Sequence, residues 1–321
     1  MHILDDFLVK RNRGYYCSYG GFYIDPLYPV ERAVVSHAHG DHASAGHQAV
    51  FCTRPTASFM QYRYPRQVKS SYQVIPYGEA VRIGEVEVAF YPAGHILGSC
   101  QILMTYRGVR YLYTGDYKLQ PDDTCEPIEI VEADVLITET TFADPGTVHP
   151  DPVSEIQKLD VDHNILLGCY ALGKAQRITA LINQWLPEKE VLLHRNMMPY
   201  HRIYDQYIDR PLRYQVYSRK AMKESPKNKV YLVPPLTFNS YRRATDVQKA
   251  FASGWRRLQA NNDISLLISD HVDWMDILDF VARVKPLAIW TLHGDGRQLH
   301  QHFHQSITIR DIHSEMPSVT D

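Results

Sequence analysis

The chain has 321 residues, of which 45% are hydrophobic and 22% charged, and its formal net charge is −2. This composition is ordinary for a soluble globular protein, and the length favours a large core with one inserted or appended unit. No apolar run approaches the ~20 residues of a membrane-spanning helix, so we expect no contact with a membrane.

The chain is expected to be cytoplasmic. Its N-terminus has neither a basic start nor a following apolar core, so we expect no signal peptide. The five cysteines are scattered and form no Cys-x-x-Cys pair. This usage fits a reducing compartment and argues against a zinc site built from cysteines.

The charge is unevenly distributed along the chain. Residues 171–260 contain 17 Lys and Arg against 6 Asp and Glu, a net charge of +11, whereas the remainder has 17 basic and 30 acidic residues, a net charge of −13. This asymmetry suggests a polyanionic substrate that is gripped by one part and cut by the other. The alternative is a set of ordinary solvated basic helices.

Residues 20–140 are predicted to form short strands separated by Gly and Pro. Apolar and polar side chains alternate in 86–90 and 109–113, which is the period of a half-buried strand. Arg107 and Gly108 lie between two such runs and predict a hairpin turn.

Three histidines and a carboxylate follow the apolar run 33–35, within the segment Ser36-His37-Ala38-His39-Gly40-Asp41-His42. A strand that ends in a tight loop can turn alternate imidazoles and a carboxylate toward one point, as first-row divalent metals require. We therefore predict a metal site. A histidine-rich surface loop is the alternative in a chain with 16 histidines.

Three further candidate ligands lie at the ends of predicted strands, namely His95, Asp116 and His293. Each adjoins small residues that permit a sharp turn, and each alone is also typical of a hydrogen-bonded structural residue. Together, three imidazoles and a carboxylate complete one site, and the same carboxylate can bridge to a second metal held by Asp41 and His42.

After the predicted strand 134–138 the pattern changes to alternating strands and helices. Strands are predicted at 134–138, 164–168, 190–194, 230–233, 264–268 and 287–290. Helices are predicted after Gly173, around 200–208 and around 274–281, and the apolar spacing of the first includes Trp185 on its core face. An α/β unit of about 150–262 thus follows the β-rich part.

The ligand residues resemble the motifs of the metallo-β-lactamase superfamily. His37-x-His39-x-Asp41-His42, His95 and Asp116 match these motifs in order and context. Asp25 looks like the first, loop-ordering aspartate of that superfamily. Beyond Asp116 the resemblance narrows to the β-CASP nucleases, because Glu139, His271 and His293 resemble their motifs A, B and C.

The resemblance implies an α/β fold, a metallo-β-lactamase αββα sandwich with an inserted α/β β-CASP domain. The implied boundaries are 1–149 and 263–321 for the two parts of the sandwich and 150–262 for the basic, substrate-gripping insertion. Within the group, segments 13–17, 170–177 and 252–255 look like the bacterial ligase-associated DNA exonuclease family.

The resemblance also implies two Zn²⁺ ions, with Mn²⁺ as an alternative. One would be held by His37, His39, His95 and Asp116, and the other by Asp41, His42, Asp116 and His293. Asp41 is assigned to the catalytic residues as well. Two such cations supply a nucleophile at neutral pH and stabilise charge during displacement at phosphorus.

His271 is the candidate general acid for the leaving oxygen. Glu139 would accept a hydrogen bond from His271, fix its orientation and favour the imidazolium form. The alternatives are structural, with Glu139 as a capping acid and His271 as an ordinary residue at a helix N-terminus.

Substrate contacts are predicted in the basic segment. Lys174 and Arg177 open a helix, where backbone N–H groups attract phosphate, although a solvated helix start has the same appearance. Ser253 and Gly254 precede Trp255 and could bind backbone phosphate, with Trp255 as a base-stacking platform or as a buried core residue.

The predicted function is a di-zinc phosphodiesterase acting on nucleic acid, with DNA as substrate and a DNA ligase or repair machinery as partner by resemblance, hence a DNA exonuclease in DNA repair. A histidine at motif C is typical of RNA-processing members, so an RNA-processing ribonuclease of the mRNA 3′-end type is the alternative. A thioester, lactone or β-lactam hydrolase would not need Glu139, His271 or a basic insertion. A non-enzymatic binding subunit is disfavoured because every liganding position is filled.

Overall fold

The computed structural model describes residues 2–68, 71–241, 243–293 and 296–313, and the chain divides into two compact units. Unit 1 comprises Met1–Pro121, Cys125–Val148 and His271–Asp321, and unit 2 comprises Asp122–Thr124 and His149–Asp270. The predicted division at 149/150 and 262/263 into functional domains stays a prediction.

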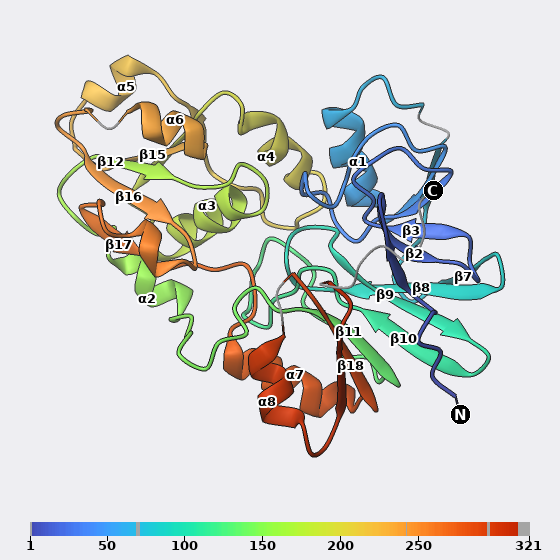
Figure 1. Cartoon of the computed structure of the whole chain (residues 1–321). Helices are drawn as coiled ribbons and strands as arrows, with labels where there is room; N and C mark the ends of the chain where they lie inside the picture. Colours follow the sequence, from blue (N-terminus) through green and yellow to red (C-terminus); the bar gives the residue numbers. More distant parts are fainter. Residues whose placement is uncertain (1, 69–70, 242, 294–295, 314–321) are drawn as a thin grey trace. The chain divides into compact units, whose positions relative to one another are not determined.

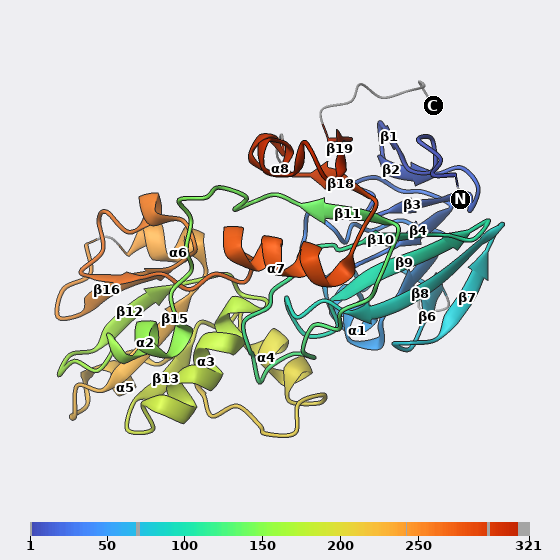
Figure 2. The ribbon, with the colours of Figure 1, turned by 90° about the horizontal axis from the view of Figure 1, so that it is seen from below.

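Unit 1 contains two sheets. The first has the order β1-β2-β3-β4-β5-β6, and β1 to β4 lie side by side in Figure 2. Its strands are β1 (Val9–Arg11), β2 (Gly14–Cys17), β3 (Phe22–Ile24), β4 (Arg32–Val34), β5 (Ala49–Cys52) and β6 (Tyr72–Val74).

The second sheet has the order β19-β18-β11-β10-β9-β8-β7. Figure 1 shows β8 to β11 and β18 next to one another. The strands are β7 (Ala80–Ile83), β8 (Val86–Pro92), β9 (Cys100–Tyr106), β10 (Val109–Tyr113), β11 (Val135–Glu139), β18 (Ala288–Leu292) and β19 (Thr308–Asp311).

The hairpin predicted at Arg107 and Gly108 is confirmed. Val109 pairs with Tyr106 across the turn, and Arg107 and Gly108 have φ angles of 48° and 77°. Two successive left-handed residues define the tight turn that matches the twist of paired strands.

Helices cover the outer faces of the two sheets in unit 1. Helix α1 (Arg54–Arg63) packs Ala57 and Met60 on the first sheet, and α7 (Trp274–Val284) packs Ile277 and Phe280 on the second. Helix α8 (Arg297–Phe303) adds Leu299 to the same side as α7. A separate apolar core fills the space between the sheets, so the layers follow the predicted αββα order.

Unit 2 is a parallel sheet covered by helices. The strand order is β14-β13-β15-β12-β16-β17, and Figure 1 shows α6 on one side of β12 and β15 and α2 and α3 on the other. The elements are α2 (Pro152–Gln157), β12 (Ile165–Gly168), α3 (Lys174–Trp185), β13 (Glu190–Leu193), α4 (Met198–Tyr204), β14 (Gln215–Val216), α5 (Arg219–Lys223), β15 (Lys229–Val233), α6 (Pro235–Ser240), β16 (Gln248–Ala252), a 3₁₀ turn (Arg256–Leu258) and β17 (Ile264–Leu266).

Two features of unit 2 differ from the sequence-based expectation. Strand β17 was expected after the boundary at 262, but Ile264 pairs with Ala250 of β16, which places the strand in unit 2. Trp185 was expected on the core face of its helix, but it is 45% exposed, whereas the next residue, Leu186, is 5% exposed and packs in the core of unit 2. Among the described residues, no helix is long and apolar enough to cross a membrane.

We expect the stability of the fold to depend on pH because unit 2 contains a buried histidine, His201. The amide nitrogen of Gln176 lies 2.9 Å from His201 Nδ1, and His201 Nε2 lies 3.1 Å from Thr179 Oγ1, whose hydroxyl donates to Ala175 O. A neutral ring satisfies this network by accepting at Nδ1 and donating from Nε2. Burial lowers the pKa of His201 from 6.5 to about 4.

Because the pKa in the folded state lies below the unfolded value, the unfolded chain binds more protons between these two pH values. The free energy of unfolding should therefore be highest above pH 6.5 and fall by about 3 kcal/mol as pH drops toward 4. Urea denaturation of the native chain and of a His201→Gln variant at several pH values measures this loss. An identical pH dependence in both proteins would show that His201 does not cause it.

Candidate metal centre

The first ligand loop begins where β4 ends. Val35 N–H donates to Phe51 O, so the chain stays paired with β5 until the loop starts. The N–H groups of His42 and Ala43 both donate to His39 O, which closes the loop into a tight turn. His37 and His42 are buried, His39 is half-buried and Asp41 is exposed.

Asp25 organises this loop from beneath. Its carboxylate accepts hydrogen bonds from Ser36 N–H at 2.7 Å, from Ser36 Oγ–H at 2.6 Å and from Tyr113 Oη–H at 3.0 Å. His42 Nδ1 lies 2.8 Å from the same carboxylate and donates to it. Since Ser36 Oγ gives its proton to Asp25, it can only accept from His37 Nδ1, at 3.0 Å. Both rings therefore bond through Nδ1 and turn Nε2 toward Asp116.

Four predicted ligands form the first cluster, in which one donor atom from each of His37, His39, His95 and Asp116 lies within 4.8 Å of every other. His39 Nδ1 is 3.1 Å from His37 Nε2 and 3.0 Å from His95 Nε2. Asp116 Oδ2 is 3.6 Å from His37 Nε2 and 3.8 Å from His95 Nε2. Four donors about 2.1 Å from one zinc ion would lie about 3.4 Å apart, so this set fits tetrahedral zinc.

A second cluster shares Asp116 with the first and adds His42 and His293. His42 Nε2 is 3.6 Å from Asp116 Oδ2, and His293 has a left-handed backbone with φ of 54°. Such a conformation costs of order 1–3 kcal/mol in a non-glycine residue and is typical of functional sites. Asp41 lies outside the cluster: its side chain is 78% exposed and its carboxylate is 4.0 Å from His42 Nε2.

The electrostatics of the histidines suit a cation. Burial and the neighbouring ring of His42 hold the pKa of His37 well below its usual value, so this ring is neutral. Burial lowers the pKa of His42, but the carboxylates of Asp116 and Asp25 outweigh it and raise that pKa to about 10. The same negative field that holds a proton there favours a divalent cation.

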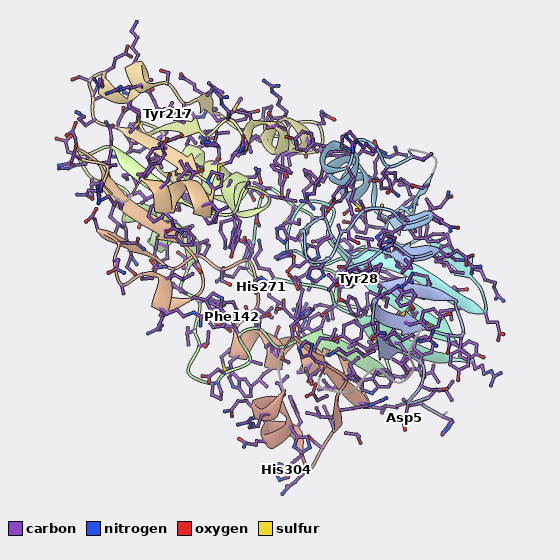
Figure 3. The ribbon with its side chains drawn as sticks, turned by 45° about the horizontal axis from the view of Figure 1, so that its top comes forward. Asp5, Tyr28, Phe142, Tyr217, His271 and His304 are labelled. Atoms are coloured by element: carbon purple, nitrogen blue, oxygen red, sulfur yellow. The ribbon has the colours of Figure 1, made fainter. Side chains whose placement is uncertain are left out.

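Glu139 and His271 form a pair beside Asp116. His271 Nδ1 is 3.0 Å from both carboxylate oxygens of Glu139, and Tyr117 N–H donates to Glu139 at 3.1 Å. Burial raises the pKa of Glu139, but His271 lowers it to a net value below the usual range, so the carboxylate is ionised. His271 Nε2 lies 4.0 Å from Asp116 Oδ2, and Figure 3 places Phe142 next to the ring, 6.0 Å between centroids.

The same geometry permits a second interpretation, in which His271 is a metal ligand. Asp116, Glu139 and His271 also have donor atoms within 4.8 Å of one another, so these three residues could hold a metal ion. Nδ1 of His271 is occupied by Glu139, as expected for a ring that is oriented through one nitrogen and acts through the other.

The side chains of Lys174 and Arg177 are in a different environment from the one that the sequence suggested. Both side chains are buried, and both pair with Asp270, at 3.0 Å from Lys174 Nζ and 3.1 Å from Arg177 Nη1. Their charges are thus compensated inside unit 2. A phosphate at either residue would have to displace these ion pairs, and the predicted phosphate contacts stay a prediction.

The segment around Trp255 is more exposed. Trp255 is 39% exposed, with the guanidinium of Arg257 4.7 Å from its ring centroid. Ser253 is buried, its N–H donates to Leu266 O and its Oγ accepts from Trp255 N–H. The phosphate contact at Ser253 stays a prediction. Gly254 is half-buried.

Known proteins that resemble the chain include enzymes named for their action on DNA or RNA. No family model matches the chain. A probable DNA ligase of Opitutus terrae is 31% identical over 313 residues, which cover 91% of this chain and 30% of that protein. An RNase J-like protein of Methanocaldococcus jannaschii is 32% identical over 190 residues, 49% of this chain and 44% of that protein. The endoribonuclease YSH1 of Mycosarcoma maydis is 27% identical over 205 residues, 49% of this chain and 22% of that protein.

The chain thus spans less than half the length of each of these relatives. Among solved structures, a protein of unknown function from Enterococcus faecalis V583 has a TM-score of 0.60 at 14% identity, covering 87% of this chain and 78% of that one. This likeness concerns the fold alone.

A metallo-β-lactamase fold that carries a buried cluster of histidines and an aspartate defines a class of metal-binding proteins. With these relatives, the chain belongs to the β-CASP group of metallo-β-lactamase-fold nucleases, as its motifs predicted.

Proposed function

We propose that the chain is a phosphodiesterase that holds two zinc ions and cleaves nucleic acid. The observation that carries the proposal is the Glu139–His271 pair, whose Nε2 faces Asp116, the residue shared by both predicted metal clusters. A hydrolase that expels a stabilised leaving group has no need for such an acid. A phosphodiester has that need, because its leaving sugar oxygen must gain a proton.

His37, His39, His95 and Asp116 would hold one ion, and His42, Asp116 and His293, with Asp41 joining them, the other. When bound, the ions supply a nucleophile at neutral pH and stabilise charge on phosphate oxygens. Glu139 keeps a proton on Nδ1 of His271 and fixes the plane of the ring. The second proton, on Nε2, is then available for the leaving oxygen.

The proposed substrate is DNA, in repair within the cytoplasm, beside a DNA ligase. Support comes from the relative named a probable DNA ligase, whose similarity extends over 91% of this chain. RNA is the second candidate, because other relatives are named RNase J-like and endoribonuclease and because His293 lies in the cluster, as is typical of RNA-processing members.

The test is a parallel digestion of end-labelled single- and double-stranded DNA and RNA, at one fixed salt concentration since phosphate contacts are salt-sensitive. Zinc content is measured on the same preparation. We expect two zinc ions per chain and cleavage of DNA. Cleavage of RNA alone would transfer the proposal to RNA processing, and hydrolysis of only thioesters, lactones or β-lactams would reject it.

Trp255 is proposed to stack on an unpaired base of the substrate. An exposed indole with a guanidinium over its face presents an aromatic platform beside positive charge, the combination that binds single strands. A Trp255→Ala variant should lose about 1–3 kcal/mol of binding free energy for a single-stranded oligonucleotide, measured by fluorescence anisotropy. Trp185, 45% exposed in the same unit, provides the matched control. An equal loss in Trp185→Ala would contradict the assignment.

A further inference from the structure

Two buried cations of unit 2 hold the three residues that precede His271. Lys174 Nζ donates to Ile268 O at 2.7 Å, and Arg177 Nη1 donates to Ser269 O. Both cations also pair with the carboxylate of Asp270, one on each oxygen. Each residue from 268 to 270 is thereby fixed by at least one charged group, so the backbone conformation of the segment is tightly specified.

Burial makes this arrangement unusual. Lys174, Arg177 and Asp270 are 4%, 2% and 5% exposed, and Arg177 Nε lies 3.5 Å from Asp122, so two positive charges meet two negative ones. Replacing buried ion pairs by apolar side chains of similar volume is often neutral or stabilising, so fold stability alone does not account for them. What such a network does provide is one defined geometry for the groups it binds.

The segment leads directly into the proposed general acid. On the other side of His271, Val272 N–H donates to Tyr117 O at 3.1 Å, and Asp273 caps the N-terminus of α7 by accepting from Asp276 N–H at 3.0 Å. Within unit 1, His271 is thus fixed by the bond of Val272 and by Glu139, which orients its ring. Within unit 2, the charged network fixes the residues that precede it.

We infer that Lys174, Arg177 and Asp270 are positioning residues, which hold the backbone before His271 so that its Nε2 meets the leaving oxygen of the substrate. The inference rests on the proposed function and gives the two cations a role in proton transfer in place of phosphate binding. A misplacement of about 1 Å at a reacting group can reduce a rate about 10²-fold.

Two substrates separate this role from the others. An oligonucleotide has an alkoxide leaving group that needs a proton, whereas a p-nitrophenyl phosphodiester of thymidine releases a stable aryl oxide that needs none. In Lys174→Met, Arg177→Met and Asp270→Asn we expect kcat for the oligonucleotide to fall about 10²-fold with KM unchanged, and kcat for the aryl ester to stay near that of the native chain. Arg177→Lys should recover part of the loss.

Lys229→Met provides the matched control. Lys229 is also a buried lysine of unit 2, 3% exposed, that pairs with Glu190 at 3.4 Å and donates to Pro226 O at 2.9 Å. Melting temperature and zinc content are measured for all variants, and Asp270→Asn, the smallest change, keeps the test informative where the others fail to fold.

The outcomes distinguish the proposals. If KM rises and activity falls equally on both substrates, Lys174 and Arg177 bind phosphate, as the sequence suggested. If kcat falls equally on both substrates with KM unchanged, and Lys229→Met behaves in the same way, the network only stabilises the fold. Either result would overturn the positioning role while leaving the nuclease proposal in place. A native chain that is inactive on both substrates would reject the proposed function, and the positioning role with it.

Discussion

An Asp116→Ala variant is expected to lose both metal ions and to be at least about 10³-fold less active, equivalent to about 4 kcal/mol. Asp116 Oδ2 lies 3.6 Å from Nε2 of both His37 and His42, so one carboxylate supplies the anionic ligand of both clusters. Without it, only imidazoles remain for the first ion, and the exposed Asp41 is the one carboxylate proposed for the second. Metal content by mass spectrometry and single-turnover cleavage of an end-labelled oligonucleotide measure the effect.

His302→Ala is the control for this variant, because His302 is an exposed histidine of unit 1 on α8. It should keep full metal content and full activity. Two ions retained by Asp116→Ala would show that the histidines suffice, and the shared carboxylate would then not be the bridge between the clusters.

The clustering of the candidate metal ligands could be predicted from sequence because their arrangement follows from local rules. A strand that ends at Val34 and a tight turn closed on His39 O bring His37, His39 and His42 together from a few consecutive positions. His95, Asp116 and His293 follow strands of the second sheet, so the topology of the sheet brings them to one edge.

The residues that orient the ligands could not be predicted in the same way. Ser36, Tyr113 and Tyr117 hold Asp25 and Glu139 through contacts between distant strands, and the sequence has no spacing that signals such pairs.

Burial was not expected at Lys174 and Arg177, where the sequence suggested phosphate contacts. At the start of a helix, charged side chains have the same appearance whether solvent or a carboxylate receives them. Here the partner is Asp270, 93 residues after Arg177, and only the tertiary structure brings it there. Helix α1 was not predicted because its apolar residues do not follow a clear helical period. Only the N-cap Thr53 and Pro55 in the first turn mark its start.

A His271→Ala variant is expected to lose about 10²- to 10⁴-fold in kcat on an oligonucleotide and to retain its metal ions. The loss should nearly vanish on a p-nitrophenyl phosphodiester, because an aryl oxide leaves without a proton. Glu139→Gln keeps the hydrogen-bonding shape but removes the charge that holds a proton on Nδ1, so an intermediate loss with the same substrate dependence is expected.

Metal content decides between the two interpretations of this pair. If His271 were a ligand together with Asp116 and Glu139, its replacement would release an ion and reduce cleavage of both substrates alike. Retained metal with a loss confined to the oligonucleotide is the result that only an acid gives, because the leaving oxygen is then the sole difference between the two reactions.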